Sequence, residues 1–324
     1  MSTPVPGLAV NQTADAHPAA AAIQALAQDV QLTAAQIQLL NTQGFLTLNP
    51  ITTPEEAGEI RNALQELFDK RAGENEGANH DFVAGDHPEA PKTAPQIINP
   101  VNYYPRLRKT ACFKNSLKLA KQILGEEARC FFDLTILKAP QVGAPTPWHQ
   151  DLAFRDPRFE YTEMNMWVAL QDVTPESGCL RYVPGSHTNP VLPHHSLNDD
   201  PTSQVFECVG QFDESKVVAC PLPAGAGVIH LPGTLHSAGP NLSASSRVAY
   251  IMVFGVPPKL AKQPQSFPWL DLKETPAQAR KRRWMRRGGA FITVWRRLRR
   301  GDLTSWQSAV YGAKRLARIL RRGA

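Results

Sequence analysis

The chain after residue 128 is divided into short runs of β-branched and aromatic residues, separated by turns that contain Gly and Pro. Runs of this length and composition predict short β-strands. Many short strands joined by such turns are typical of a β-sandwich or a jelly roll. The predicted strands cover residues 129–138, 164–170, 180–183, 217–219, 227–231 and 247–254.

Helices are predicted mainly near the N-terminal end. A short amphipathic helix begins near Thr33 and stops near Gly44, and residues 45–48 then form a strand. Pro54 opens a second helix with acidic residues in its first turn, as the helix dipole favours. A third helix is predicted over residues 115–124. The sequence therefore predicts a mainly β fold with flanking helices, in which a helical buttress supports a jelly-roll core.

The chain of 324 residues is interpreted as one domain with an extension at each end. Residues 1–31, rich in Ala, Pro and Gln, are predicted to be a flexible leader, and residues 32–272 form the domain. Within it, the polar stretch 73–100 is expected to be a long loop, of the kind that often acts as a lid or binds substrate. Residues 273–324 are a basic amphipathic C-terminal extension.

Charge is distributed unevenly along the chain. From residue 276 to the end there are 15 Lys or Arg and one acid, a charge of +14, so the total of +6 leaves −8 for the rest. No run is apolar and long enough to cross a bilayer, and the first residues lack the pattern of a secretory signal. The five cysteines form no CxxC pair, and their odd number argues against a complete disulfide framework, so a cytoplasmic protein is expected.

The most informative polar residues are His149 and Asp151. In an extended segment alternate side chains share a face, so both can point inward while Gln150 points away. His236 follows another predicted strand and supplies a third ligand. Two imidazoles and one carboxylate on one side of iron(II) leave positions open for a bidentate co-substrate and for O2. A His-x-Asp motif alone also occurs in solvent-exposed loops, so it needs its structural context.

Arg247 provides that context, eleven residues beyond His236. Arginine offers planar, bidentate donors that suit the distal carboxylate of 2-oxoglutarate. The alternative is a surface charge on an edge strand. However, residues 248–253 are apolar or aromatic and predict a buried setting, which an unpaired charge would not tolerate.

Together these segments resemble the phytanoyl-CoA dioxygenase family in order and spacing, over residues 32–257. The resemblance rests on Trp148 to Asp151, residues 165–170, residues 178–187, and His236 with Arg247.

The resemblance implies a double-stranded β-helix, which is a cupin-like jelly roll. It also implies Fe(II) on His149, Asp151 and His236, with 2-oxoglutarate held by Arg247 and O2 as the oxidant. The chain departs from the family pattern at Ala238, where a serine often helps to bind the 2-oxoglutarate carboxylate.

Another donor is then needed at that place, and Thr135 and Ser237 are the two candidates. Asp151 occupies the position that related halogenases leave open with Gly or Ala, so hydroxylation is favoured over halogenation.

Three further residues have a functional and a structural interpretation. The family pattern places Trp167 against the 2-oxoglutarate pocket, although it could equally fill the barrel core. Arg181 precedes a turn at the rim of the site and is a candidate substrate contact, or a strand arginine paired with an acid. Asp133 lies in an apolar strand and either faces the cavity, where it would contact substrate or Arg181, or is a satisfied structural carboxylate.

The C-terminal extension ends in a helix-like segment, residues 303–322, with apolar residues at three- and four-residue spacing opposite basic ones. Peripheral contact with an anionic membrane surface is the first interpretation, because basic amphipathic helices with Trp and Phe bind there. A clasp on the acidic body or a dimer arm is the second. Nucleic acid is the third, because no reader motif accompanies the basic residues.

The sequence thus predicts a dioxygenase that hydroxylates an unactivated C–H bond of a small-molecule or lipid-like substrate and releases succinate and CO2. The same centre could instead catalyse desaturation, epoxidation or epimerisation, which the mass of the product separates in part. A barrel-fold binding protein without chemistry is the alternative from another class.

Overall fold

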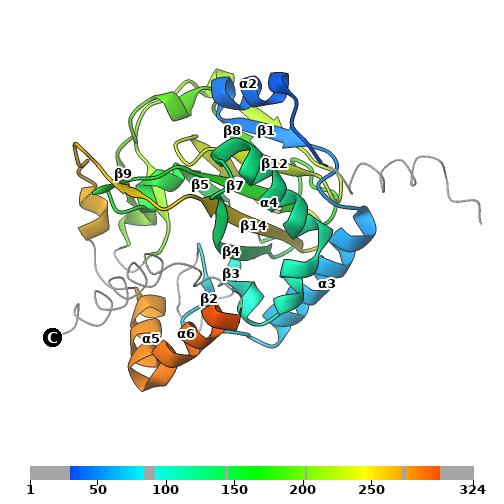
Figure 1. Ribbon diagram of the computed structural model, residues 1–324, viewed down its shortest axis with the longest axis vertical. Coiled ribbons are helices and arrows are strands. Elements are labelled where there is room, and N and C mark those ends of the chain that lie inside the picture. The colour runs from blue at the N-terminus through cyan, green and yellow to red at the C-terminus, as the bar shows by residue number, and fades with distance from the viewer. Residues whose placement is uncertain (1–29, 84–91, 143–144, 201–202, 272–274, 300–324) are drawn as a thin grey trace, which may run out of the picture.

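Two facing β-sheets form the centre of the molecule, with helices packed on the larger one (Figure 1). The computed structural model describes residues 30–83, 92–142, 145–200, 203–271 and 275–299. The larger sheet has seven strands in the order β1 (Phe45–Leu48), β12 (Gly227–His230), β7 (Glu163–Ala169), β14 (Arg247–Gly255), β4 (Arg129–Lys138), β3 (Pro95–Ile98) and β2 (Asn79–Asp81).

The smaller sheet has four strands, in the order β11 (Val218–Cys220), β8 (Leu180–Tyr182), β13 (His236–Ala238) and β5 (Thr146–His149). Two further strand pairs lie outside these sheets: β9 (His194–Ser196) with β10 (Phe206–Cys208), and β6 (Phe159–Glu160) with β15 (Lys259–Leu260). All strand pairs are antiparallel. This arrangement confirms the predicted jelly-roll core with flanking helices.

Side chains alternate between the two faces of the larger sheet, and each face contributes to its own apolar cluster. Trp167, Ala249 and Ile251 point toward the smaller sheet and pack with residues such as Leu180. Tyr250, Met252 and Phe254 belong to the other cluster, which includes the helices. The face that a residue occupies therefore decides whether it lines the space between the sheets.

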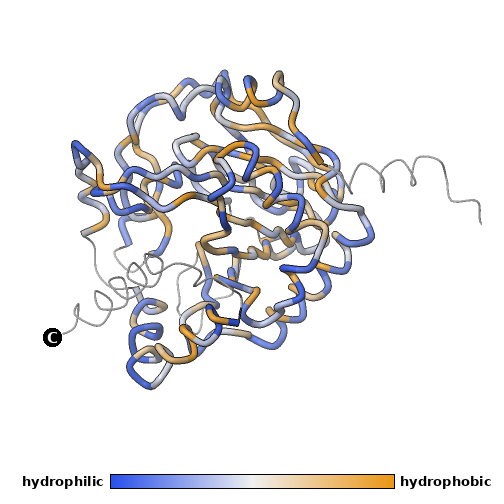
Figure 2. The backbone as a smooth tube through the Cα atoms, in the orientation of Figure 1, coloured by the Kyte–Doolittle hydropathy of each residue, from blue (hydrophilic) through white to orange (hydrophobic). Residues whose placement is uncertain are grey.

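Three helices cover or flank the larger sheet: α2 (Ala34–Gln43), α3 (Pro54–Asp69) and α4 (Ala111–Leu124). Each begins at a threonine whose side chain accepts a hydrogen bond from the first turn. Leu64 of α3 and Leu119 of α4 are fully buried against the sheet. Figure 2 shows the same division, with hydrophobic colour on the central strands and hydrophilic colour on the outer turns of the helices.

The strands expected from residue 129 onward are present with ends that differ by one residue at most. The expectation of a simple loop over residues 73–100 was wrong, because β2 and β3 lie within it and extend the larger sheet beside β4. The sequence Asn79, His80, Asp81 has no apolar residue, so only pairing with β3 makes it a strand. Most of the leader and the helix expected over residues 303–322 lie outside the described residues.

Two C-terminal helices, α5 (Pro276–Trp284) and α6 (Ala290–Arg299), lie against the segment that follows α3 (Figure 1). Arg296 forms two contacts with Glu76, at 2.7 and 3.1 Å. Gly77 approaches α5 so closely that an added Cβ would lie 2.2 Å from the Ala277 carbonyl oxygen. Within the described part of the chain, every helix is too short or too polar to span a bilayer.

Candidate metal and co-substrate site

His149, Asp151 and His236 meet between the sheets, and one potential ligand atom from each lies within 4.8 Å of the others. His149 ends β5 and His236 begins β13, and the two residues are direct partners in the antiparallel register. Asp151 begins a short 3-10 helix, Asp151–Phe154, after an extended Gln150. The predicted alternation is therefore observed, since the Gln150 side chain turns away and donates to the Gly233 carbonyl at 2.8 Å.

Both imidazoles are oriented for metal binding. Nδ1 of His149 donates to the Pro147 carbonyl at 2.8 Å, and Nδ1 of His236 donates to the Thr234 carbonyl at 2.9 Å. These bonds leave each Nε2 as the unprotonated ligand atom. Burial lowers the pKa of His149 and of His236, so both rings are kept neutral, which metal coordination requires.

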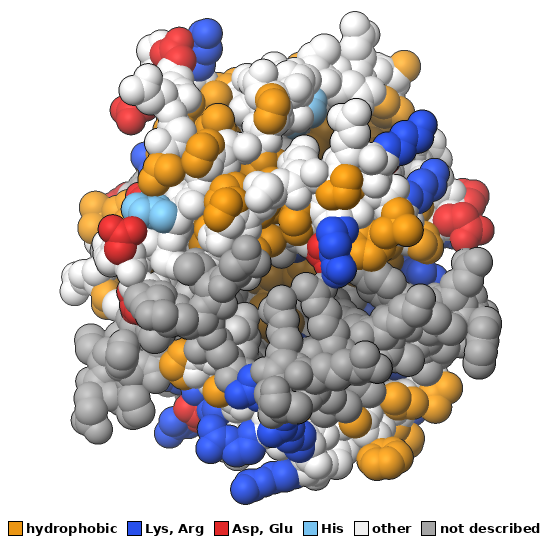
Figure 3. All heavy atoms as spheres, turned by 90° about the vertical axis from the view of Figure 1, so that its left-hand side faces the viewer, with side chains coloured by type: hydrophobic (Ala, Val, Ile, Leu, Met, Phe, Trp, Pro, Cys, Tyr) orange, Lys and Arg blue, Asp and Glu red, His pale blue; other side chains and the backbone are white. Residues whose placement is uncertain are grey.

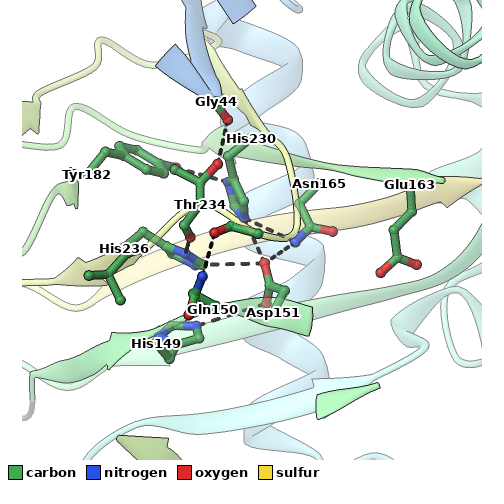
Figure 4. A network of polar contacts seen from close by, with 12 residues as sticks. Gly44, His149, Gln150, Asp151, Glu163, Asn165, Tyr182, His230, Thr234 and His236 are labelled. Atoms are coloured by element: carbon green, nitrogen blue, oxygen red, sulfur yellow. Dashed lines mark hydrogen bonds and ion pairs between the residues drawn. The ribbon is translucent and has the colours of Figure 1, made fainter. Parts of the chain in front are cut away.

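The carboxylate of Asp151 is fixed by two side chains from the larger sheet (Figure 4). Asn165 Nδ2 donates to its Oδ2, and His230 Nε2 donates to the same oxygen at 3.0 Å. Tyr182 donates to His230 Nδ1 at 3.0 Å and so selects the tautomer that can donate to Asp151. Oδ1 thus stays available for a metal.

Burial on its own raises the pKa of Asp151, but the nearby imidazoles of His236, His230 and His149 outweigh it. The pKa of this carboxyl consequently lies well below its ordinary value. Two neutral nitrogens and one ionised carboxylate fit iron(II) and leave open positions on the metal. The residues present therefore fit the group that the family pattern implies.

The sequence patterns did not single out His230. Its place beside the ligands comes from strand pairing, which sets His230 opposite Asn165 across β12 and β7 and which the sequence does not show. Asn165 shares a face of β7 with Trp167, and that face points into the space between the sheets. Such strand pairings determine which residues lie beside a metal ligand. Here the paired residues are 65 positions apart in the sequence.

Arg247 also points into this space, and it is 2% exposed. One of its terminal nitrogens donates to the Gly178 carbonyl at 3.1 Å, and its guanidinium carbon lies 5.4 Å from the centre of the Trp167 ring. Its Nε has no hydrogen-bond partner, and no carboxylate of the described residues pairs with it. Burial lowers the pKa of Arg247 to about 10. A buried, unneutralised cation of this kind is suited to an anionic ligand.

Thr135 and Asp133 do not face the site. They pair with Tyr250 and Met252 of β14, whose side chains lie in the helix-side cluster. Thr135 donates to the Ala249 carbonyl at 2.9 Å, and Asp133 accepts a 2.7 Å hydrogen bond from Tyr250. This geometry does not fit the co-substrate role expected for Thr135, and of the two interpretations of Asp133 it favours the structural carboxylate over the residue facing the cavity.

Ser237 and Arg181 lie on the outer face of the smaller sheet. Each alternates with a residue that points inward, His236 and Tyr182 respectively. Arg181 Nε donates to Ser237 Oγ at 3.2 Å and its guanidinium carbon lies 5.3 Å from the centre of the Trp148 ring. The structure therefore brings neither residue to the cluster, because β8 and β13 turn them away together.

A cavity of about 600 Å³ lies between the β9–β10 pair and the residues before α5. It adjoins residues 149–153, the segment that carries the ligands His149 and Asp151. Two of its lining residues form hydrogen bonds to that segment. His194 Nε2 accepts a hydrogen bond from the Gln150 amide at 3.2 Å, and Trp269 Nε1 donates to the Ala153 carbonyl at 2.9 Å. The cavity is lined by Val191, Pro193, His194, His195, Ser196, Asp199, Ser266, Pro268 and Trp269.

A jelly roll that carries two histidines and a carboxylate at this place defines a class of non-haem iron oxygenases. The sequence profile of the phytanoyl-CoA dioxygenase family (PhyH) matches residues 40–249, which is more than half of the chain. The chain belongs to this family. It is accordingly a non-haem iron dioxygenase that depends on 2-oxoglutarate and O2.

Individual relatives agree with this assignment. Phytanoyl-CoA dioxygenase domain-containing protein 1 from Danio rerio is 22% identical over 259 residues, which cover 68% of this chain and 88% of that protein. The solved structure of EvdO2 from Micromonospora carbonacea var. aurantiaca, complexed with 2-oxoglutarate, is 34% identical. It has a TM-score of 0.64 and covers 74% of this chain and 97% of that one.

A second solved structure shares the fold. The epimerase SnoN, in complex with Fe3+, alpha ketoglutarate and nogalamycin RO, is 21% identical with a TM-score of 0.53. The match covers 68% of this chain and 82% of SnoN.

Proposed function

We propose that this protein hydroxylates an unactivated C–H bond of a small-molecule substrate. His149 Nε2, Asp151 Oδ1 and His236 Nε2 would hold iron(II), which would couple oxidation of the substrate to oxidative decarboxylation of 2-oxoglutarate. The balance is one substrate, one 2-oxoglutarate and one O2 converted to one alcohol, one succinate and one CO2. The observation that carries this proposal is the restrained Asp151 carboxylate, which supplies the third protein ligand.

The chain's own residues prepare the site for that chemistry. Arg247 binds the distal carboxylate of 2-oxoglutarate, and Trp167 packs against the guanidinium and restricts its position. Asn165 and His230 prevent Asp151 from rotating. His149 and His236 are buried, and their burial limits the access of bulk water to the space where the substrate is oxidised.

The cavity beside β9 is proposed to receive the substrate. Its walls contact the backbone of the segment between His149 and Ala153, so the cavity adjoins the part of the chain that carries two of the metal ligands. Trp269 stacks on Phe267 with ring centres 4.9 Å apart and offers an apolar platform, while Asp199 and His195 supply polar groups. A volume of about 600 Å³ accommodates a small organic molecule.

The test is an anaerobic titration of the iron(II)-loaded protein with 2-oxoglutarate, followed by exposure to O2. A metal-to-ligand charge-transfer band and later formation of succinate are expected for the wild type. Neither signal is expected for Asp151→Ala, because this variant lacks one ligand. A wild type without the band would contradict the proposal and favour a binding protein.

The mass of the product separates the reactions open to this centre. Hydroxylation adds one oxygen atom, and desaturation removes two hydrogen atoms. Because epoxidation of an alkene also adds one oxygen, the position of the new oxygen must be found by NMR. An unchanged mass with inverted stereochemistry would indicate epimerisation and would overturn hydroxylation.

A lipid-like substrate and contact with an anionic membrane are proposed from α6. Phe291, Trp295 and Leu298 are 82%, 55% and 60% exposed, and their spacing places them on one face of the helix. Figure 3 shows Lys and Arg side chains gathered at the lower end of the molecule, where Figure 1 places α5 and α6. An apolar stripe beside arginines suits the headgroup region of anionic phospholipids.

This contact is tested by sedimentation with vesicles. The wild type is expected to bind vesicles that contain phosphatidylserine, and not vesicles of phosphatidylcholine alone. Trp295→Asp should reduce binding, whereas Leu260→Asp, at an apolar residue 74% exposed on β15, should not. Equal binding to both vesicle types, or self-association through the stripe, would reject the membrane proposal.

A further inference from the structure

The cavity beside β9 contains a buried hydroxyl group without a partner. Ser196 lines the cavity and is 5% exposed, and its Oγ forms no hydrogen bond with any of the described residues. Buried hydroxyls are normally paired, because an unpaired one loses its hydration and gains nothing in return. The position of this Oγ therefore suits a polar group of a bound ligand.

Negative charge lies next to this hydroxyl. His195 Nδ1 is 2.9 Å from Asp199 Oδ1, and His195 Nε2 is 3.4 Å from Glu207 Oε2. Glu207 is the register partner of His195 across β9 and β10, and His195 and Asp199 both line the cavity. Two carboxylates outweigh one imidazole in either protonation state, so these three residues carry a net negative charge.

The walls of the cavity do not neutralise this charge. Among the described residues that line it there is no lysine or arginine. His194 is uncharged, because its Nδ1 donates to the Leu192 carbonyl at 2.7 Å and its Nε2 accepts from the Gln150 amide at 3.2 Å. Burial also lowers the pKa of His194 to about 4. A partly enclosed site with charge of one sign concentrates ligands of the opposite sign.

The other walls are apolar. The Trp269 ring stacks on Phe267 with ring centres 4.9 Å apart and an angle of 15° between the planes. Val191, Pro193 and Pro268 add further apolar surface. The cavity therefore offers an apolar surface for the body of a ligand, together with acidic and hydroxyl groups for a polar head.

We propose that the cavity binds a substrate that carries a protonated amine, with the ammonium group donating to Asp199 and to Ser196 Oγ. This inference rests on the proposed function, in which the cavity receives the substrate. An ammonium group has three hydrogens and no acceptor, so it can donate to a carboxylate and to an unpaired hydroxyl oxygen. A substrate with a carboxylate or a phosphate at the same place is repelled by Asp199 and Glu207.

The experiment uses three probes that share a phenyl ring and differ in charge. They are 2-phenylethylamine, which is a cation at pH 7, 2-phenylethanol, which is neutral, and phenylacetate, which is an anion. Binding to the protein loaded with iron(II) and saturating 2-oxoglutarate is measured anaerobically by ligand-observed NMR. The ionic strength is kept low because salt screens exposed charges. This measurement needs no turnover.

The wild type is expected to bind 2-phenylethylamine about fivefold more tightly than 2-phenylethanol, and to bind phenylacetate most weakly. This ratio corresponds to a charge pair that is partly exposed to solvent. Similar affinities for the three probes, a preference for phenylacetate, or no binding of any probe would overturn the proposal.

Asp199→Asn removes the charge and keeps the size of the side chain. It should weaken 2-phenylethylamine binding by about two- to fivefold and leave 2-phenylethanol binding unchanged. The matched control is Glu55→Gln, at an exposed acid in the first turn of α3, and it should change neither affinity. An equal effect of the two substitutions would show that the selectivity arises from the overall charge and would refute the role of the cavity.

Ser196→Ala tests the hydroxyl separately. Because this hydroxyl is unpaired in the free protein, its removal should leave the free energy of unfolding unchanged or higher. Binding of 2-phenylethylamine should nevertheless weaken by about three- to tenfold, the range for one hydrogen bond. Unchanged binding of the amine in this variant, whatever its stability, would contradict the proposed contact.

Failure of the amine proposal can be distinguished from failure of the proposed function. A wild type that shows the charge-transfer band with 2-oxoglutarate but binds phenylacetate best would overturn the amine substrate alone. A wild type that binds 2-phenylethylamine but forms no such band would contradict the proposed function and leave a cavity that binds amines.

Discussion

The Asp151 carboxylate has a fixed orientation as a ligand because one of its oxygens already accepts two hydrogen bonds. Asn165 and His230 both donate to Oδ2, and they come from neighbouring strands of the larger sheet. His149 and His236 belong to the smaller sheet and Asp151 follows its strand β5, whereas the two side chains that hold Asp151 belong to the larger sheet. Metal affinity therefore depends on the packing of the two sheets as well as on the three ligands.

Asn165→Ala should weaken iron(II) binding by about 10- to 100-fold, because the freed carboxylate can rotate away from the metal. The measurement is an anaerobic metal titration, with circular dichroism to verify folding. Gln171→Ala is the matched control, since this amide donates to the Ser246 carbonyl, away from the ligands. An unchanged affinity in Asn165→Ala would mean that His230 alone orients Asp151.

The ligands could be predicted from sequence, whereas their surroundings could not. His149 and Asp151 lie in a segment where alternation and a polar residue between them set the orientation. Thr135 lies in a strand with both faces covered, and β14 is buried at all nine positions. The hydropathy pattern then does not indicate which face lines the cavity, because both faces are apolar.

At the scale of elements, the turn between α2 and β1 supports the loop before His236. Gly44 ends α2 with φ of +83°, and its carbonyl accepts a 2.8 Å hydrogen bond from Thr234. A Cβ at Gly44 would lie 2.4 Å from His187 Nδ1 and 2.5 Å from Thr234 Oγ1. The backbone conformation and the space both require glycine here.

Gly44→Ala should lower the free energy of unfolding by more than about 2 kcal/mol, because strain and overpacking add. Chemical denaturation measures this loss, and a metal titration should show weaker binding because the loop before His236 shifts. Gly58→Ala is the control, since a Cβ in the middle of α3 meets nothing within 4 Å. That variant should be neutral or more stable by up to about 1 kcal/mol.

The β2–β3 extension has its own dependence on pH. His80 of β2 is 4% exposed and contacts the Gln96 side chain. Burial, followed by the positive charge of Arg280, lowers the pKa of His80 to about 4. Because the unfolded chain binds the proton near pH 6.5, stability is retained above that pH and lost as the pH falls toward 4.

The loss attributable to His80 should amount to about 3 kcal/mol, from a shift of roughly 2.5 units. Urea unfolding at pH 7 and at pH 4.5 measures this loss as the difference between the two free energies of unfolding. His80→Gln should make that difference smaller. The same substitution at the more exposed His195 should leave the difference in place. An identical difference in His80→Gln and the wild type would contradict this origin.

At the scale of the whole molecule, strand positions were predictable and strand partners were not. Local composition located the strands that carry the site, since β-branched and aromatic residues mark them. The pairing of β2 with β3 depends on contacts outside the segment, as residues 79–81 have no β-forming pattern of their own. The position of α5 beside Gly77 likewise depends on contacts across about 200 residues.

The docking of α5 also bears on the exposed edge of the larger sheet. β2 is the last strand of the larger sheet, and strands in that position offer free backbone groups on which another chain can add a strand. Arg280 reaches the Asn79 carbonyl at 3.5 Å, and α5 lies across the segment that leads into β2. The extension thus covers part of a sheet edge to which another strand could otherwise be added.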